Sequence, residues 1–470
     1  AIGTQNYQTI ISKMVEALKH RGPNAQNTWN NETTYFGHAR LSIIDLSESA
    51  NQPMHSSDNR YVIVYNGELY NYKDLKLELQ RVAQGTANLP YNFKTNSDTE
   101  VILAAYQRWG ADCLNKFNGM FAFALYDSQE KTLFIARDRV GIKPLYYAYK
   151  NEQLIFASEV RSILNSGFVE RKLNRNVINE YFLYQTVHAQ NTIIDEVKIL
   201  MPGHYMLMKD GDVTIKKYWD LNNFTNASNN LDYKQTCAKT RELLFQSVER
   251  RLVADVPFGA FLSGGIDSSA VVGIMSKMSS KKVETFNVSF DDSEFSEAKY
   301  AKKIAEQFGT NHHEIKLSPN DFLNQLPEAL NALDHPSGDG ANTYVVSKAT
   351  KQAGITMALS GLGGDESFAG YDVFKRMTEI NKKNYLNLFP AWMRKLPASA
   401  LKAKNKSIAG DKIYEVLGQE KVNIATAYPI SRKVFSDSQI QGLLKNKSVN
   451  NLSVLINKIK TADKEHILSY

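Results

Sequence analysis

The hydrophobic positions divide the chain into two patterns. In the first half, apolar residues recur with helical spacing from Ile10 to Leu18 and from Val101 to Trp109. The other apolar positions fall in short extended runs joined by polar turns, as in 120–136, 145–157 and 204–218. Antiparallel hairpins at this density predict stacked antiparallel sheets, with the two helices packed outside them.

Local signals place several boundaries within the first half. Tyr35 to Ile44 and Tyr61 to Tyr65 are rich in aromatic and β-branched residues and are predicted to be strands. The dipeptide Asn66-Gly67 follows and is typical of tight turns, so we expect a turn there. Ser97-Asp98-Thr99-Glu100 combines a capping serine with acidic residues, which predicts the first turn of the helix that ends near Trp109.

The order of elements changes after residue 230. Segment 221–230 is polar and rich in turn-forming residues, so we place the domain linker there. Beyond it, helical patterns alternate with near-continuous apolar runs, which predicts an α/β fold with a parallel sheet covered on both faces. We therefore expect two domains, 1–220 and 221–470. Ligands of parallel sheets bind beyond the carboxyl ends of the strands.

Composition and charge narrow the class of protein. The 470 residues include 43% hydrophobic and 22% charged residues, and the net charge of +7 comes without a basic block, so we expect no nucleic-acid partner. No apolar run has the length of a membrane span, and no secretory leader opens the sequence. The two cysteines, Cys113 and Cys237, lie in helix-like patterns, which excludes a disulfide framework and favours a cytoplasmic location.

The clearest chemical signal is the stretch Ser263-Gly264-Gly265-Ile266-Asp267-Ser268-Ser269. It joins an apolar run, Val256 to Leu262, to an apolar helical pattern, so it predicts a strand, a glycine turn and a helix N-terminus. Backbone N–H groups in such a turn converge at the positive end of the helix dipole, where an anion binds well. The serine hydroxyls add donors, and Asp267 offers a carboxylate to a hard cation. The Walker Gly-Lys-Ser/Thr ending is absent, and an ordinary strand–turn–helix corner is the alternative.

This loop resembles the pyrophosphate-binding loop of ATP pyrophosphatases, which cleave ATP between the α and β phosphates and leave AMP on a substrate carboxylate. With seven other segments in the same order, it resembles the asparagine synthetase family of glutamine-hydrolysing, ATP-dependent amidotransferases, from about Glu16 to about Tyr371. The resemblance implies an N-terminal-nucleophile glutaminase domain followed by a synthetase domain. The other segments are Lys19–Pro23, Ala39–Leu46, Tyr65–Asn71, Ser97–Glu100, Ala136–Arg139, Gly141–Tyr147 and Leu359–Glu366.

For the first half, the resemblance implies a glutamine site. Arg40 would pair with the glutamine carboxylate, and Asp98, helped by Glu68, would bind the α-ammonium. Asn66 and Gly67 would supply the oxyanion hole. Each residue also has an ordinary interpretation: a surface salt bridge for Arg40, a helix cap for Asp98, and a hairpin turn for Asn66-Gly67. The full expected glutamine-binding set is Arg40, Ile43, Asn66, Gly67, Glu68 and Asp98.

The family nucleophile is a cysteine at the mature amino terminus, whose own α-amine acts as base. Ala1-Ile2-Gly3 does not match the Cys-Gly-Ile start of the family. We expect that a leading segment with this cysteine is missing from the sequence, because the glutamine-binding residues are intact and the usual first strand is also absent. The alternative is an enzyme that uses free ammonia.

For the second half, the resemblance implies a site for ATP and Mg²⁺. Asp267 and Asp365 match the magnesium-binding aspartates, and the ion favours attack by a carboxylate on the α-phosphorus. Glu366 would take a proton when ammonia attacks the acyl-adenylate; the alternative for Asp365-Glu366 is an acidic helix N-terminus. The residues that match ATP-binding positions are Leu262, Ser263, Gly264, Gly265, Asp267, Ser268, Ser269, Val288, Ser360 and Gly361.

Two segments depart from the family pattern. Segment 334–343 lies where the family shapes the acceptor pocket, and its glycine-rich form resembles a branch found among bacterial surface-polysaccharide enzymes. The sequence also stops before the family's Glu-x-Arg-x-Pro-Phe segment and active-site lysine. We therefore expect a complete enzyme to have more chain beyond Tyr470.

The resulting hypothesis is a ligase that amidates an acceptor carboxylate with ammonia from glutamine and releases AMP and pyrophosphate. Aspartate is the default acceptor, and a uronate-type sugar carboxylate is its rival. Two other hypotheses stay open: a synthetase that forms a β-lactam or macrolactam, and a non-catalytic scaffold that senses glutamine or ATP. The expected partners are small-molecule substrates, with a homodimer as one possible assembly.

Overall fold

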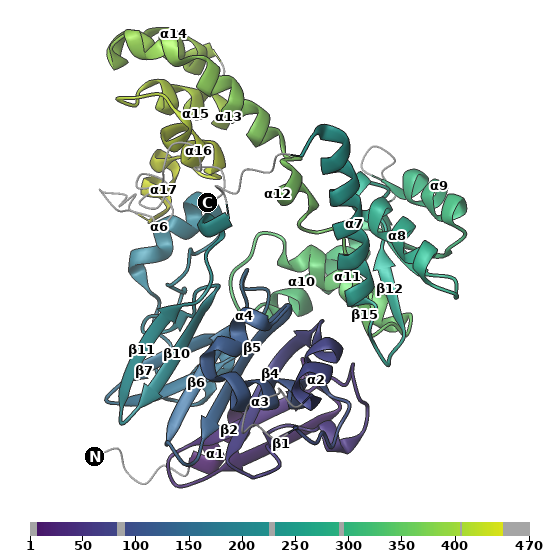
Figure 1. Cartoon of the computed structure of the whole chain (residues 1–470). Coiled ribbons are helices and arrows are strands. Elements are labelled where there is room, and N and C mark those ends of the chain that lie inside the picture. Colours follow the sequence, from purple (N-terminus) through teal and green to yellow (C-terminus); the bar gives the residue numbers. More distant parts are fainter. Residues whose placement is uncertain (1–6, 82–89, 225–230, 291–295, 405–406, 445–470) are drawn as a thin grey trace. The chain divides into compact units, whose positions relative to one another are not determined.

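The computed structural model describes residues 7–81, 90–224, 231–290, 296–404 and 407–444 (Figure 1). Its contacts divide the chain into two compact units, which are described separately. The expected domain boundary at 220/221 lies inside the first unit and stays a prediction, and residues 225–230 of the expected linker lie outside the described residues. The first unit comprises Ala1–Arg171, Glu196–Glu328 and Tyr344–Ser360, and the second comprises Lys172–Asp195, Ala329–Thr343 and Gly361–Tyr470.

The first unit begins with helices and antiparallel strands. Its first helical elements are α1 (Tyr7–Glu16), η1 (Glu48–Ala50), α2 (Tyr72–Gln80), α3 (Asp98–Trp109), η2 (Gly110–Asp112), α4 (Cys113–Lys116) and α5 (Val160–Asn165). Its first strands are β1 (Ala25–Asn30), β2 (Tyr35–Arg40), β3 (Met54–His55), β4 (Tyr61–Leu69), β5 (Gly119–Asp127), β6 (Thr132–Arg137), β7 (Tyr146–Lys150), β8 (Gln153–Ala157), β9 (Lys198–Ile199), β10 (His204–Lys209) and β11 (Asp212–Lys217).

These strands form three antiparallel sheets. The largest has six strands in the order β11-β10-β6-β5-β4-β3. The strands β1 and β2 pair with each other, and β7 lies between β8 and β9. The three predicted hairpins are present as β5–β6, β7–β8 and β10–β11. The structure therefore confirms the predicted antiparallel sheets of the first half.

The turn predicted at Asn66-Gly67 was wrong. Both residues lie inside β4, where Asn66 is opposite Ala122 and Gly67 is opposite Phe121 in the pairing with β5. A Cβ atom on Gly67 would lie 2.3 Å from the carbonyl oxygen of Met120. The glycine is therefore needed for a close approach of two backbones within a sheet, not for a turn conformation.

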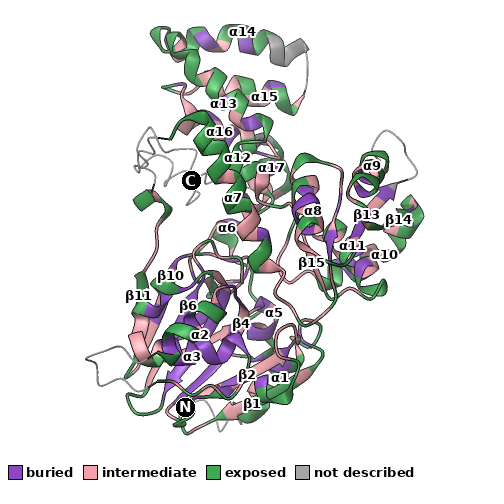
Figure 2. Ribbon diagram, turned by 45° about the vertical axis from the view of Figure 1, so that its right-hand side comes forward, coloured by how far each residue is buried: buried purple, intermediate pink, exposed green. Residues whose placement is uncertain are grey.

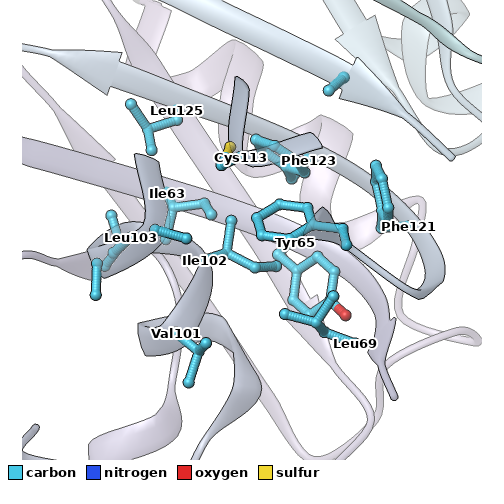
Figure 3. Close-up of a cluster of buried hydrophobic side chains, with 14 of the residues drawn as sticks. Ile63, Tyr65, Leu69, Val101, Ile102, Leu103, Cys113, Phe121, Phe123 and Leu125 are labelled. Atoms are coloured by element: carbon cyan, nitrogen blue, oxygen red, sulfur yellow. The ribbon is translucent and has the colours of Figure 1, made fainter. Parts of the chain in front are cut away.

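Apolar side chains cover both faces of the six-stranded sheet. On one face, Ile102 and Leu103 of α3 pack with Ile63 of β4 and with Phe123 and Leu125 of β5 (Figure 3). A second cluster on β4, β5 and β6 includes residues of the two smaller sheets. Figure 2 shows these strands as mostly buried. The two smaller sheets therefore stack on one face of the large sheet, while α3 covers the other.

The helix α1 lies outside the small sheet of β1 and β2. A Cβ atom on Gly37 of β2 would lie 2.3 Å from a methyl carbon of Val15, so the helix packs directly on that strand. The first turn of α3 is also as predicted. The side chain of Ser97 accepts a hydrogen bond from the N–H of Thr99, and Asp98 and Glu100 are the acidic residues of that turn.

The rest of the first unit is built around a parallel sheet of four strands in the order β14-β13-β12-β15. Apolar residues of three helices, α7, α8 and α9, pack with β12 in one cluster, which confirms the predicted α/β architecture. The elements of this part are η3 (Leu221–Phe224), α7 (Tyr233–Arg251), β12 (Phe258–Phe261), α8 (Ile266–Met278), β13 (Glu284–Phe290), α9 (Ala298–Phe308), β14 (Asn311–Leu317), α10 (Pro319–Ala332), α11 (Gly340–Gln352) and β15 (Met357–Leu359). The end of α10 and the start of α11 fall within Ala329–Thr343, which belongs to the second unit.

The second unit is helical in its described part, as expected for the sequence beyond residue 381. Val373 and Met377 of one helix pack against Ala427 of another in its core. The N–H of Val434 donates a hydrogen bond of 2.6 Å to the carbonyl of Leu183, which joins the segment 172–195 to this unit. Its elements are α6 (Arg175–Tyr184), α12 (Gly364–Phe368), α13 (Asp372–Lys382), η4 (Asn384–Leu388), α14 (Ala391–Lys404), α15 (Ile408–Leu417), α16 (Ile424–Arg432) and α17 (Asp437–Leu444).

Two general expectations can be compared with the structure. Among the described residues, no helix is both long and apolar enough to cross a membrane. Cys113 and Cys237 are both free thiols. Cys113 is fully buried, and burial raises the pKa of its thiol, whereas Cys237 is exposed on α7. Cys113 is therefore a small core residue, which is the ordinary interpretation of a buried cysteine.

Candidate active sites

The residues expected to bind glutamine all line one cavity of about 1080 Å³ in the first unit. Arg40 lies at the end of β2 and Ile43 in the loop that follows. The run from Asn66 to Glu68 lies in β4, and Asp98 begins α3. Three separate stretches of sequence therefore meet at the predicted site.

Arg40 is buried, with an exposed fraction of 6%. One of its terminal nitrogens, Nη1, donates hydrogen bonds to the carbonyl of Ser47 at 2.7 Å and to Oδ1 of Asn51 at 2.8 Å. The other, Nη2, donates to the carbonyl of Asp45. The surface salt bridge considered from the sequence is therefore not what holds this side chain. A guanidinium has five N–H groups, so two remain without a partner among the described residues, the number that a bidentate carboxylate contact uses.

Asp98 is buried at the positive end of α3. Its Oδ2 accepts a hydrogen bond from the hydroxyl of Tyr65 at 2.9 Å and another from the N–H of Leu69 at 2.9 Å. Burial raises the pKa of its carboxyl, and these hydrogen bonds act in the opposite direction. Ser97, not Asp98, is the capping residue of the helix, so the alternative interpretation of Asp98 as the cap was wrong.

The backbone of Gly67 is turned away from β5. Its partner across the ladder is Phe121, whose N–H donates to Oδ2 of Asp138 at 3.2 Å and whose carbonyl accepts from the N–H of Asp138 at 2.8 Å. Both polar groups of Phe121 are thus directed to the side opposite Gly67. In an antiparallel ladder this makes Gly67–Phe121 a pair without mutual hydrogen bonds, and the N–H of Gly67 points to the other edge of β4.

The same edge of β4 carries two neighbouring N–H groups with known partners. Tyr65 donates to Oε1 of Gln52 at 2.6 Å, and Leu69 donates to Asp98. Among the described residues, the buried side-chain nitrogen Nδ2 of Asn66 has no hydrogen-bond partner. Donors at adjacent positions that line a cavity can hold an oxygen atom on which negative charge develops. This geometry supports the predicted oxyanion hole.

Glu68 lines the same cavity and is strongly perturbed. Burial, together with the nearby charge of Asp98, raises the pKa of its carboxyl to about 7, while Lys143 acts in the opposite direction. Burial lowers the pKa of Lys143. Within the described residues, Oε1 of Glu68 has no hydrogen-bond partner. The guanidinium of Arg40 and the acidic side chains of Glu68 and Asp98 thus line the same cavity, which suits a ligand with a carboxylate and an ammonium group.

His38 and Lys143 are cavity residues that were not predicted. Nε2 of His38 lies 3.1 Å from the carbonyl of Tyr65, which can only accept, so Nε2 carries the proton. Burial lowers the pKa of His38 to about 4, and in the described part of the chain its Nδ1 has no partner. Both residues stood inside or next to recognised motifs, but only the folded chain places their side chains beside the cavity.

The serine-glycine loop has the predicted form. Residues 263–265 follow β12, and α8 begins at Ile266 with Gly265 as its N-cap. Gly264 has a φ of +86°, and a Cβ atom there would lie 2.5 Å from Cβ of Tyr300 and 2.7 Å from the backbone nitrogen of Ala301. Only glycine fits this conformation and this close approach of α9.

Hydroxyl groups surround the start of α8. Oγ of Ser263 lies 2.9 Å from Oγ of Ser268 and accepts a hydrogen bond from the N–H of Gly265 at 3.2 Å. Oγ of Ser269 is buried and lacks a partner among the described residues. A helix of 13 residues without a side-chain cap, preceded by two glycines, suits an anion such as a phosphate. The donors present therefore fit the phosphates of ATP.

The remaining predicted ATP-binding residues lie near strand ends. The N–H of Leu262 donates to the carbonyl of Phe286 at 2.8 Å, and the carbonyl of Leu262 accepts from Nδ2 of Asn287 at 2.9 Å. Val288 follows in β13, and Ser360 follows β15. Because all four strands are parallel, the segments that follow β12 and β15 leave the same edge of the sheet. Asn287 was not predicted, and its Oδ1 is also buried without a partner among the described residues.

The predicted metal-binding and base residues are divided between the two units. Asp267 lies in the first turn of α8, whereas Gly361, Asp365 and Glu366 belong to the second unit. The hydroxyl of Tyr371 donates to Oε1 of Glu366 at 2.8 Å and lowers the pKa of that carboxyl. The described residues contain no cluster of three or more potential metal ligands. A magnesium ion held by two carboxylates and by phosphate oxygens does not require such a cluster.

Comparison with known proteins identifies the family. The sequence profile of the glutamine amidotransferase domain matches residues 1–219, and that of asparagine synthase matches residues 239–439. Over 450 residues the chain is 33% identical to glutamine-hydrolyzing asparagine synthetase 1 of Bacillus subtilis, covering 95% of this chain and 68% of that protein. The chain belongs to the glutamine-hydrolysing asparagine synthetase family. It is therefore a member of a family of ligases that form carbon–nitrogen bonds.

Two further relatives show the range of this family. Over 419 residues the chain is 34% identical to putative glutamine-hydrolyzing asparagine synthetase 2 of Methanocaldococcus jannaschii, covering 83% of this chain and 78% of that protein. Over 390 residues it is 32% identical to amidase chyE of Penicillium rubens, covering 79% of this chain and 56% of that protein. Relatives with different names match at nearly the same identity, so identity alone does not assign the acceptor.

Proposed function

We propose that this family member transfers the amide nitrogen of glutamine to an acceptor carboxylate that has been activated with ATP, releasing AMP and pyrophosphate. One observation carries the proposal. The same chain combines a cavity suited to a zwitterionic amino acid, around Arg40 and Asp98, with a serine-glycine loop suited to phosphate. A glutaminase alone would not need the loop, and an ammonia-using synthetase would not need the cavity.

In the first half, the proposed ligand of the cavity is glutamine. The two remaining N–H groups of Arg40 would hold its α-carboxylate, and the carboxylates of Asp98 and Glu68 would hold its α-ammonium. The side-chain amide of Asn66 and the N–H of Gly67 would stabilise the oxygen of the glutamine amide as it becomes negatively charged. Their directions within β4 support this role.

In the second half, ATP supplies an AMP group that turns a carboxylate into a reactive mixed anhydride. The residues Ser263–Ser269 would bind the β and γ phosphates through backbone N–H groups and hydroxyls. Asp267 and Asp365 would hold Mg²⁺ against the phosphates, although these two residues lie in different compact units. Leu262, Val288, Ser360 and Gly361 would line the adenosine and the α-phosphate.

The last step is attack of ammonia on the activated carboxyl carbon. The new C–N bond forms, the bond between that carbon and the AMP oxygen breaks, and AMP leaves with the electron pair. The attacking nitrogen must also lose a proton. The hydrogen bond from Tyr371 favours the ionised form of Glu366, and an ionised carboxylate at this position would accept the proton.

The acceptor is proposed to be aspartate, with a uronate-type sugar carboxylate as the second candidate. The glycine-rich segment 334–343 favours the sugar, whereas the names of the relatives from Bacillus subtilis and Methanocaldococcus jannaschii favour aspartate. A synthetase that forms a lactam would have no use for a glutamine cavity, and a sensing scaffold would bind ATP without turnover. A cytoplasmic location and a homodimer stay predictions.

The test is pyrophosphate exchange into ATP with a panel of carboxylates, using ammonium chloride as the nitrogen source. Aspartate and uronate sugars are compared directly, and the nucleotide product is identified. We expect magnesium-dependent exchange with one class of acceptor and AMP as the product. Asp267→Asn and Asp365→Asn should abolish the exchange, and Asp321→Asn on α10 is the matched control. Release of ADP and phosphate would rule out the mechanism.

A further inference from the structure

Asp255, in the second half of the chain, forms hydrogen bonds with the loop that follows Arg40, the residue predicted to bind the glutamine carboxylate. The N–H of Asp255 donates a hydrogen bond of 2.9 Å to the carbonyl of Ile43. The carboxylate of the same residue accepts, through Oδ2, a hydrogen bond of 2.8 Å from the N–H of Asp45. Asp255 lies three residues before β12, the strand that leads into the serine-glycine loop. Ile43 and Asp45, the two residues that Asp255 contacts, belong to the first half.

Asp45 forms hydrogen bonds both with Arg40 and with the segment just before Asp98. Its carbonyl accepts a hydrogen bond from Nη2 of Arg40. Its Oδ1 accepts from the hydroxyl of Ser47 at 2.5 Å, and Oδ2 accepts from the N–H of Asn96 at 2.9 Å. Asn96 lies two residues before Asp98. Asp45 therefore links Arg40 to the segment that leads into Asp98.

The backbone of Asp45 adopts an uncommon conformation. Its φ of +52° lies in the left-handed region, which aspartate adopts more readily than most residues other than glycine. Beside the turn lies a second cavity of about 970 Å³, lined by residues of both halves, among them Leu46 and Val256. Asp255 donates one hydrogen bond to Ile43 and accepts one from Asp45, and both hold this turn.

We propose that Asp255 is a positioning residue for glutamine recognition, supplied by the nucleotide-binding half to the glutamine-binding half. It touches no reacting atom and acts through Asp45 on the guanidinium of Arg40. The inference rests on the proposed function, because it assumes that the cavity around Arg40 binds glutamine. It goes beyond that function by assigning part of the glutamine affinity to a residue outside the glutaminase domain.

The test is calorimetric titration of glutamine into the chain and into two variants of Asp255. Asp255→Ala removes the acceptor for Asp45, whereas Asp255→Asn keeps one oxygen that can accept the same hydrogen bond. Loss of one exposed hydrogen bond is worth about 0.5–1 kcal/mol, so we expect glutamine to bind about 2- to 5-fold more weakly to the alanine variant. The asparagine variant should lie between the parent and alanine.

A second ligand separates a positioning role from a general loss of structure. Affinity for ATP with Mg²⁺, measured on the same samples, should change less than about 2-fold in both variants, because the hydrogen-bond partners of Asp255 named above, Ile43 and Asp45, lie in the first half. Asp321→Ala is the matched control, since the carboxylate of this exposed aspartate accepts local hydrogen bonds from Ser318 at the start of α10. It should leave the affinity for glutamine unchanged.

The outcomes distinguish this inference from the proposed function. Equal glutamine affinity of the parent and the alanine variant would overturn the role of Asp255 and leave the proposed function intact. An equal loss of glutamine and ATP affinity would show a general structural role instead. Failure of the parent chain to bind glutamine would count against the proposed function itself.

Discussion

The hydroxyl of Tyr65 donates a hydrogen bond of 2.9 Å to Oδ2 of Asp98, so a core side chain of β4 supports the carboxylate that is predicted to bind an ammonium group. Tyr65 belongs to the apolar cluster between α3 and the sheet (Figure 3), and Asp98 begins α3. The hydrogen bond favours the ionised form of a buried carboxyl whose pKa burial raises. The core and the candidate glutamine site are thus linked through one hydroxyl.

The variant Tyr65→Phe tests this link. Removing the hydroxyl should raise the pKa of Asp98 further and reduce its ionised fraction, so the affinity for glutamine should fall by about 3- to 10-fold near pH 7. The affinity is measured by calorimetry between pH 6 and 8.5, and the loss should be larger at the lower pH. Tyr61→Phe on the same strand is the control. Equal affinity across this range would contradict the supporting role of Tyr65.

Glu68 predicts a pH dependence of stability. Its pKa is about 7 in the folded chain against an ordinary value of 4.5. Because the folded chain holds this proton more tightly than the unfolded chain, the contribution of Glu68 to the free energy of unfolding is largest below pH 4.5. It is lost as the pH rises through the folded pKa of about 7. Glu68→Gln removes this titration. Above pH 7 its free energy of unfolding should exceed that of the parent by on the order of 2 kcal/mol.

The measurement for Glu68→Gln is urea unfolding at pH 5 and at pH 8.5. The difference from the parent should be small at the lower pH and large at the higher one. Glu78→Gln is the control, because Glu78 is exposed and pairs with Lys116 at 2.8 Å on the surface. A constant difference at both pH values would show that the side chain acts through packing and not through its charge.

Gly264 predicts a steric effect on nucleotide binding. Gly264→Ala places a Cβ atom against Tyr300 and Ala301 at a positive φ, so α9 and the loop must move apart. We expect the affinity for ATP to fall by at least about tenfold, which corresponds to about 1.4 kcal/mol. Gly309→Ala is a matched control because Gly309 also has a positive φ, of +65°, but a Cβ atom there meets nothing within 4 Å. Similar ATP affinity of the two variants would count against a close-fitting loop.

Tyr371 predicts the protonation state of Glu366. The hydrogen bond from its hydroxyl is the main cause of the lowered pKa of Glu366. In Tyr371→Phe the pKa should rise toward its ordinary value near 4.5, which a pH titration of the side-chain carboxyl carbon by NMR measures directly. The spectrum of Glu366→Gln identifies the resonance. Tyr344→Phe removes a similar hydrogen bond to Glu328 and is the control, because it should leave the pKa of Glu366 unchanged.

The sequence predicted features that local chemistry determines. The serine-glycine loop and the first turn of α3 were correct because a glycine at positive φ and a capping serine need only a few neighbouring residues. Asn66-Gly67 was misassigned because the same dipeptide suits a turn and a close approach of two strands. Only the pairing with β5, about fifty residues further along the chain, distinguishes the two.

Features that depend on long-range contacts could not be predicted. Nε2 of His38 donates to the carbonyl of Tyr65, and Nδ1 is left without a partner among the described residues. No local sequence pattern predicts this contact. The grip of Asp255 on Asp45 joins residues 210 positions apart. The segment 172–195 joins the second compact unit through contacts such as that of Leu183 with Val434. Each of these depends on where distant parts of the chain meet.

Because Cys113 is buried and Cys237 is exposed, the rate of thiol labelling can report local unfolding of the first half. A maleimide reagent should modify Cys237 on the surface of α7 at once, whereas Cys113 reacts only when the core around α3 and β5 exposes it. The slow phase of such labelling would give the rate at which the first half opens. Bound glutamine should lengthen that phase, without any change to the sequence.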